Sequence, residues 1–295
     1  MAEFDAAGIA VYALSYDEPD ALADYARAHG VGFPLFSDPD SEVIRAFGIL
    51  NTQIPPDDHP WFGIPYPGTF VMDEDGVIVA KFFENSLHFR PSARQLLRAA
   101  LGEEIELPPL DAPPGEVAFD VHLDSDALRP GVKSELVVRF AVPDGQHLYG
   151  EPVPDGMVPT SVTIDDEVGL NVWPASFPPT TEHTLTTGET LHVYEGDVLV
   201  RIPITHVNRS RIELEDGSFV QRITGTARWQ ACDDDMCFLP RTETFSIDVT
   251  ATAHSRPEDE FANPEGMAII DHLQKMASRR TDESFADLLR KAADG

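Results

Sequence analysis

The chain has 295 residues, of which 51 are acidic, 21 are lysine or arginine and 2 are cysteine, so its formal net charge is −30. This length favours two domains that each bury a core without the help of disulfides. The acidic balance predicts repulsion from phosphate backbones and anionic membranes, which argues against nucleic-acid and membrane partners. Two cysteines exclude a disulfide-rich scaffold and a four-thiolate zinc site, although they can still form one pair.

Neither a membrane span nor an export signal is visible in the sequence. The longest apolar run, Ile9–Leu14, is far shorter than the roughly 20 residues that a membrane helix needs. The opening residues MAEFDAAG carry acidic side chains where a signal peptide carries lysine or arginine.

The first third of the chain alternates strand-like and helix-like patterns. Two short segments rich in β-branched and aromatic residues are each followed by a helical pattern that begins near a Glu-Pro or Asp-Pro step. Two further apolar runs flank Asp73–Gly76, which indicates a hairpin. This order predicts an α/β layer fold with a mixed sheet. The expected strands are 8–14, 33–38, 69–72 and 77–83, and the expected helices are 17–28, 38–47 and 92–101.

A change of pattern divides the chain. Residues 107–116 contain four prolines and no periodicity, so we expect a stiff linker there. Beyond it, short alternating segments separated by turn residues predict an immunoglobulin-like β-sandwich over 117–252. Residues from Pro264 onward return to a helical pattern, which predicts a helical tail over 253–295. The expected sandwich strands are 117–123, 134–142, 160–164, 191–204, 219–231 and 242–250.

Several motifs in the first part resemble the AhpC/TSA peroxiredoxin and redoxin branch of the thioredoxin superfamily. The residues that carry this resemblance are Ser15 and Asp17, Phe33–Leu35, Ser37–Pro39, Gly48, Thr69-Phe70, Asp73 and Gly76. The resemblance implies a thioredoxin-like domain over 1–106 that is incomplete at its N-terminus. In that family a strand and the helix with the reactive cysteine precede the strand found here at 9–14.

Without a cysteine before Cys232, this part lacks the thiolate that peroxide reduction requires. We therefore expect peroxidase activity only from a longer form of the protein. A truncated reading frame and a natural pseudo-enzyme both explain the pattern. The resemblance also implies that Pro67 corresponds to the cis-proline of thioredoxin-like reductases and that Thr69 supports the same site.

A second group of motifs resembles the N-terminal periplasmic domain of the thiol:disulfide interchange protein DsbD. The residues are WQACDDDMCFLP at 229–240, HLYGEPVPDG at 147–156, Trp173-Pro174 and Tyr194–Gly196. The resemblance implies an immunoglobulin-like sandwich with one redox cysteine pair, an extracytoplasmic location and thioredoxin-like partner proteins. It also implies that Cys237 forms the mixed disulfide with the partner and that Cys232 resolves it.

Three interpretations of the cysteine pair remain open: a redox couple, a structural disulfide, and half of an intersubunit metal site. Cys232 ends a predicted strand and Cys237 begins the next, so a tight loop can bring them within disulfide distance. Closing so short a loop is worth only about 2 kcal/mol, which favours redox exchange. Asp233, Asp234 and Asp235 lie in the loop and should raise the pKa of the thiols until a partner docks.

The aromatic residues near the pair have two interpretations as well. Trp229, Tyr194 and Phe238 are candidates to pack around the cysteines, and a plain core role is the alternative. His147 and Tyr149 invite an acid–base interpretation. The resemblance implies that they lie at the sandwich edge near the cysteine loop, which favours a structural role.

The leading hypothesis is a thiol-disulfide oxidoreductase that relays electrons through Cys232 and Cys237. The alternative is a non-catalytic interaction module with a structural disulfide. No cofactor and no metal site are expected, and the oligomeric state stays open.

Overall fold

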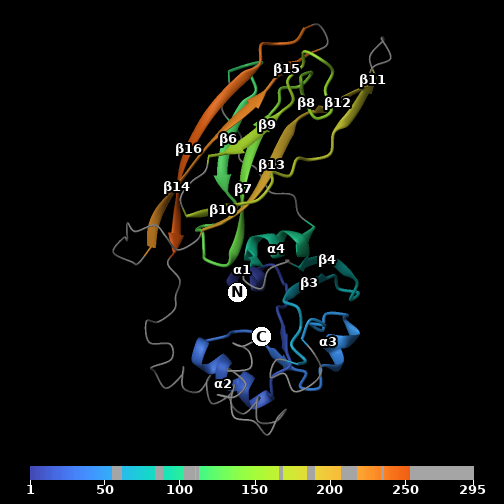
Figure 1. Ribbon diagram of the computed structural model, residues 1–295, viewed down its shortest axis with the longest axis vertical. Helices are drawn as coiled ribbons and strands as arrows, with labels where there is room; N and C mark the ends of the chain where they lie inside the picture. The colour runs from blue at the N-terminus through green and yellow to red at the C-terminus, as the bar shows by residue number, and fades with distance from the viewer. Residues whose placement is uncertain are drawn as a thin grey trace. The chain divides into compact units, whose positions relative to one another are not determined.

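The computed structural model describes residues 1–54, 62–83, 89–102, 110, 113–165, 169–184, 190–206, 218–233 and 236–252. The chain divides into two compact units, one of residues 1–87 with 255–295 and one of residues 88–254 (Figure 1). The expected tail at 253–295 and most of the expected linker lie outside the described residues, so both stay predictions.

The described part of the first unit contains two strand pairs and three helices. β1 (Ala13–Ser15) and β2 (Leu35–Ser37) pair in parallel, whereas β3 (Gly68–Met72) and β4 (Ile78–Phe83) form the predicted antiparallel hairpin. Among the described residues these pairs are two separate sheets, not the single mixed sheet that we expected. The helices are α1 (Ala2–Ala6), α2 (Pro19–His29) and α3 (Glu42–Ala46).

Local side-chain chemistry explains where the helices of this unit begin and end. Pro19 occupies the start of α2, and Gly30 ends it with a left-handed φ of 61°. α3 begins later than predicted, because the Asp38 carboxylate accepts hydrogen bonds from the backbone N–H groups of Glu42 and Ile44, both at 2.9 Å. Asp38 thus closes a turn ahead of the helix. The buried hydrophobic residues of the unit are Phe4, Tyr16, Leu22, Ile44 and Val71.

The second unit is a mostly antiparallel β-sandwich with a further, four-stranded sheet at one end (Figure 1). β7 (Val132–Ala141) and β13 (Asp197–His206) pair along their lengths in a five-stranded sheet, and β14 (Ser218–Trp229) pairs with β16 (Arg241–Thr252) in a three-stranded sheet. A four-stranded sheet has the order β11-β12-β8-β15. The remaining strands are β5 (Arg90–Pro91), β6 (Ala118–Leu123), β8 (His147–Tyr149), β9 (Ser161–Ile164), β10 (Leu170–Val172), β11 (Thr181–Thr184), β12 (Thr190–Tyr194) and β15 (Ala231–Cys232).

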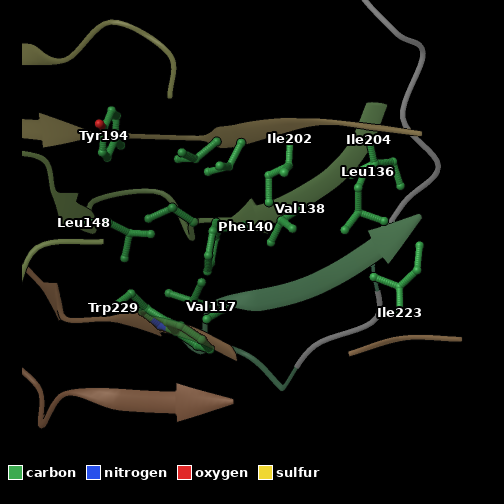
Figure 2. Close-up of a cluster of buried hydrophobic side chains, with 14 of the residues drawn as sticks. Val117, Leu136, Val138, Phe140, Leu148, Tyr194, Ile202, Ile204, Ile223 and Trp229 are labelled. Atoms are coloured by element: carbon green, nitrogen blue, oxygen red, sulfur yellow. The ribbon is translucent and has the colours of Figure 1, made fainter. Parts of the chain in front are cut away.

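The core of the sandwich lies between the sheets of β7/β13 and β14/β16. Figure 2 shows side chains from both sheets converging, with Phe140 and Trp229 on facing sides. Their ring centroids are 5.3 Å apart in an edge-to-face contact. Ile223, Ala227 and Trp229 are buried on β14, as its alternating sequence predicted. The immunoglobulin-like interpretation of this part is consistent with two packed antiparallel sheets.

Further differences from the sequence-based expectation concern the strand at 191–204 and the helix at 92–101. The strand predicted at 191–204 is two strands, because Gly196 adopts a left-handed φ of 64° between β12 and β13. The predicted helix forms as α4 (Ala93–Leu101), with a Ser92–Gln95 capping box. However, the division of the chain falls at residue 87, so α4 lies in the second unit, whereas the sequence places it in the first domain.

Candidate functional site

The two cysteines form a disulfide at the end of the four-stranded sheet. Cys232 ends β15, which pairs with β8 so that Cys232 lies opposite His147. The Cα atoms of Cys232 and Cys237 are 4.0 Å apart, and the two residues form an antiparallel bridge. Asp233 closes the loop between them, since its carboxylate accepts a 2.8 Å hydrogen bond from the Met236 N–H. The predicted pairing is therefore confirmed. Asp234 and Asp235 lie outside the described residues.

Tyr149 is the polar side chain that contacts the disulfide. Its hydroxyl lies 3.0 Å from Cys232 Sγ and 3.3 Å from Cys237 Sγ. Burial raises the pKa of Tyr149, so the hydroxyl keeps its proton at neutral pH and can donate a hydrogen bond to sulfur. The sequence favours a structural role for Tyr149 over an acid–base role, and these contacts place its hydroxyl against both sulfurs. Its place in the HLYG motif is what makes it a candidate from the sequence.

The two sulfur-bearing residues differ sharply in exposure. Cys232 is 1% exposed and belongs to a small apolar cluster with Tyr149, Leu191 and Val193. Cys237 is exposed. An incoming thiol therefore reaches Cys237 more readily than Cys232. Around the loop lie three exposed apolar side chains, which are Met236 at 58%, Phe238 at 37% and Leu239 at 87%.

Gln230 fixes the loop from within the protein, a role that sequence reasoning missed. Its side-chain oxygen accepts a 3.0 Å hydrogen bond from the Val158 N–H, and its amide donates to the Phe238 carbonyl oxygen at 3.1 Å. The Phe238 N–H in turn donates to the Ala231 carbonyl oxygen at 2.9 Å. These bonds hold both sides of the disulfide loop in place.

Trp229 and Tyr194 lie in the main core of the sandwich (Figure 2). Trp229 packs against Phe119 and Phe140, and Tyr194 stacks on Phe177 with ring centroids 6.2 Å apart. Neither belongs to the small cluster that holds Cys232. The structure thus places both where the core interpretation expected them, whereas Phe238 lies beside the disulfide.

Pro67 and Thr69 lie in the first unit, which contains no cysteine. The cis peptide bond among the described residues precedes Pro152, so the peptide bond before Pro67 is trans. The expected cis-proline is therefore wrong, and Pro67 precedes β3 as an ordinary trans residue. Thr69 pairs with Phe82 in the β3–β4 hairpin.

Within the described ranges, no group of three or more His, Cys, Asp or Glu side chains is arranged to hold a metal ion. Over the same residues, no helix has both the length and the apolar character needed to cross a membrane.

Comparisons with protein families also divide the chain into two parts. Residues 1–81 match the AhpC/TSA family, and residues 111–249 match the N-terminal domain of the thiol:disulfide interchange protein DsbD. The chain joins a redoxin-like part to a DsbD-type part. The disulfide site lies in the DsbD-type part, and the redoxin-like part has no cysteine.

Curated relatives of the redoxin-like part are named as peroxiredoxins. Two from Mycobacterium tuberculosis are each 40% identical over 83 residues, which is 27% of this chain and 49% of the relative. One from Haemophilus influenzae is 31% identical over 84 residues, which is 27% of this chain and 50% of the relative. The chain thus spans about half the length of the curated relatives it matches.

Solved structures similar to the chain include DsbD N-terminal domains from Neisseria meningitidis. The reduced form is 19% identical with a TM-score of 0.28, covering 44% of this chain and 83% of that domain. A complex between the DsbD and PilB N-terminal domains is 18% identical with a TM-score of 0.30, covering 46% of this chain and 86% of that one. The N-terminal periplasmic domain of ScsB from Proteus mirabilis is 11% identical, with a TM-score of 0.28 over 47% of this chain and 48% of that one.

Proposed function

We propose that this protein is a thiol–disulfide relay that exchanges its Cys232–Cys237 disulfide with partner thiol proteins. The observation that carries the proposal is the asymmetry of the site. Cys237 is exposed, whereas Cys232 is buried beside the Tyr149 hydroxyl. A structural disulfide needs no hydrogen-bond donor at its sulfurs, but a sulfur that becomes a thiolate does.

In the proposed exchange, a thiolate of the partner attacks Cys237 Sγ and forms a mixed disulfide with it. The Cys232–Cys237 bond breaks, and its electron pair goes to Cys232 Sγ, where Tyr149 donates a hydrogen bond. A second thiolate of the partner then attacks the mixed disulfide and releases Cys237. The partner dithiol is oxidised to a disulfide, the protein disulfide is reduced to a dithiol, and two protons pass between them. The reverse sequence oxidises the protein.

The surface around the loop favours a protein partner over a small thiol. Met236, Phe238 and Leu239 expose apolar side chains next to Cys237, and such residues are typical of contact surfaces. The Asp233 carboxylate adds negative charge at the same place, which should disfavour thiolate formation until a partner covers the loop. A thioredoxin-like protein with an apolar face around its own cysteine would fit these features.

A test uses two single-cysteine variants and glutathione disulfide as the probe. In Cys232→Ser the exposed Cys237 remains, and we expect it to form a mixed disulfide with glutathione, seen by mass spectrometry. In Cys237→Ser only the buried Cys232 remains, and we expect a reaction at least roughly tenfold slower, because reaction follows exposure. Equal rates would contradict the assigned roles.

The alternative function is a non-catalytic interaction module in which the disulfide only holds the loop. The exposed Met236, Phe238 and Leu239 side chains favour a docking role whether or not the sulfurs react. This alternative predicts a reduction potential of the Cys232–Cys237 pair below about −300 mV, as structural disulfides have.

A further inference from the structure

The strand register places two histidines on the face of the four-stranded sheet that carries Cys232. His147 lies directly opposite Cys232, and Tyr149 is two residues further along β8. Tyr149 pairs with Val193 of β12, and Leu191 of the same strand pairs with His183 of β11. Paired residues, and residues two apart on a strand, share a face of a sheet. His147, Tyr149 and His183 therefore lie on the same face as the buried cysteine.

Ring contacts connect these residues. The His147 and Tyr149 rings meet edge to face with centroids 5.4 Å apart, and the His147 and His183 rings are 6.0 Å apart. His183 Nε2 lies 3.5 Å from Glu195 Oε1, and His183 and Glu195 have side chains that are 44% and 51% exposed. A chain of ionisable rings thus runs from the surface to the Tyr149 hydroxyl, which contacts both sulfurs.

The ionisable groups that the structure describes on this face and in the loop are His147, His183, Tyr149, Glu195, Asp233 and the two cysteines. Of these groups, only the two imidazoles can carry a positive charge, because the others are neutral or negative. The two histidines are therefore the groups on this face that could offset the charge of a new thiolate.

We propose that His147 and His183 are positioning residues for thiol exchange, whose imidazolium forms stabilise the Cys232 thiolate released when Cys237 is attacked. This inference rests on the proposed relay function. A neighbouring positive charge lowers the pKa of a thiol, and a sulfur with a lower pKa leaves faster. Histidine changes its charge near neutral pH, so exchange at this site should become faster, per attacking thiolate, as the histidines protonate.

The electron pair and the proton follow a defined course in this step. The attacking thiolate bonds to Cys237 Sγ, and the electron pair of the broken bond stays on Cys232 Sγ. The imidazolium pair balances that charge until the sulfur takes up a proton, which comes from an imidazolium or from the partner's second thiol. That second thiol, as a thiolate, then displaces Cys237.

The experiment measures how fast dithiothreitol opens the disulfide of the oxidised full chain, with a metal chelator present. Opened thiols are trapped by alkylation after an acid quench, and the rate is divided by the concentration of dithiothreitol thiolate. We expect this corrected rate constant to be roughly three- to tenfold higher at about pH 6 than at about pH 8.5. In the double variant His147→Gln/His183→Gln, we expect the ratio of the rate constants at the two pH values to fall to about one. The rate constant at about pH 6 should decrease, and that at about pH 8.5 should stay the same.

Two further variants separate charge from structure. His183→Lys keeps a cation at both pH values, so its corrected rate constant should stay high at both. His192→Gln is the matched control, because His192 lies on β12 between Leu191 and Val193 and so faces the opposite side of the sheet. It should behave as the unmodified chain does.

The outcomes distinguish the inference from the function on which it rests. An unchanged ratio in the double variant, or an equal slowing at both pH values, would overturn the role of the histidines while leaving the relay intact. A disulfide that dithiothreitol does not open at any pH would overturn the relay function itself.

Discussion

At Tyr149 a single hydroxyl lies within hydrogen-bonding distance of both sulfurs. Replacing it in Tyr149→Phe keeps the buried ring but removes the donor. Because a hydrogen bond to a charged group is worth about 1.5–3 kcal/mol, we expect the pKa of the Cys232 thiol to rise by about 1–2. The measurement is a pH titration of thiolate absorbance in the reduced protein, made in a Cys237→Ser background so that only Cys232 contributes.

The matched control for that titration is Tyr12→Phe. Tyr12 is 59% exposed and its ring stacks on Phe36 in the first unit. It should leave the titration midpoint of Cys232 unchanged. A Tyr149→Phe midpoint equal to that of the Cys237→Ser parent would show that the hydroxyl does not stabilise the thiolate.

The sequence predicted the cysteine pair, whereas it offered Tyr149 only as a residue of undecided role near the cysteine loop. Cys232 and Cys237 are near neighbours in the chain, so their loop could be recognised locally. Tyr149 lies 83 residues before Cys232, and its position depends on the pairing of β8 with both β12 and β15. Sequence alternation within one short strand does not determine which strands become its neighbours.

Among the elements, α4 is attached to the sandwich through a cluster of charged side chains that are partly or fully buried. Arg98 on α4 lies 2.6 Å from Glu135 on β7, and Arg201 on β13 lies 3.0 Å from the same carboxylate. Asp124 is 3.7 Å from Arg98, and its side chain is 1% exposed. Burial raises the pKa of Glu135, but hydrogen bonds and attraction from Arg98 and Arg201 outweigh it and hold the pKa below its usual range.

Asp124 gives this cluster a pH dependence that can be measured. Burial raises its pKa from 3.8 to about 6, against the hydrogen bond from the Glu135 N–H. The proton is therefore bound more tightly in the folded state, so the stabilisation is fully present below pH 3.8 and is lost as the pH rises through about 6. Asp124→Asn removes the titrating carboxyl group. Between about pH 4 and 7, the unfolding free energy of this variant should therefore fall less than that of the unmodified chain, by up to about 3 kcal/mol.

Urea unfolding of the full chain at the two pH values, followed by circular dichroism, makes this comparison. Asp144→Asn is the control, because Asp144 is an exposed aspartate in the same unit. The opposite pH response of Glu135 lies below about pH 4.5, because its pKa is held below its usual range, so it falls mostly outside the pH interval compared. If the unfolding free energy of Asp124→Asn changes with pH as much as that of the unmodified chain, the role given to Asp124 is refuted.

Long elements were predictable, whereas several short ones were not. The alternation over β14 and β16 predicted both strands, since alternate residues are buried on β14 and partly buried along most of β16. β8, β10 and β11 have three or four residues each, too few for a periodic pattern to appear. The attachment of α4 was missed as well, because its partners Asp124 and Glu135 come later in the chain.

At the scale of the whole molecule, the chain carries a redoxin-like part without a cysteine and a DsbD-type part with a cysteine pair. We expect the reduced chain alone to consume at most about one equivalent of hydrogen peroxide more than its Cys232→Ser/Cys237→Ser variant, because a cysteine pair can be oxidised once without turnover. Catalytic peroxide reduction needs an activated thiolate, and the redoxin-like part supplies none. Loss of peroxide in solution, in the presence of excess dithiothreitol, is the measurement. Turnover beyond the background of the variant would mean that the DsbD-type pair is itself a peroxidase.

The reduction potential of the Cys232–Cys237 pair tests the relay most directly. It is measured by equilibrating the full chain with thiol–disulfide buffers of known potential and counting free thiols by mass spectrometry. The relay requires a potential above about −300 mV, where partner thiol proteins can reduce the pair. A potential below about −300 mV would contradict the relay and identify the disulfide as structural.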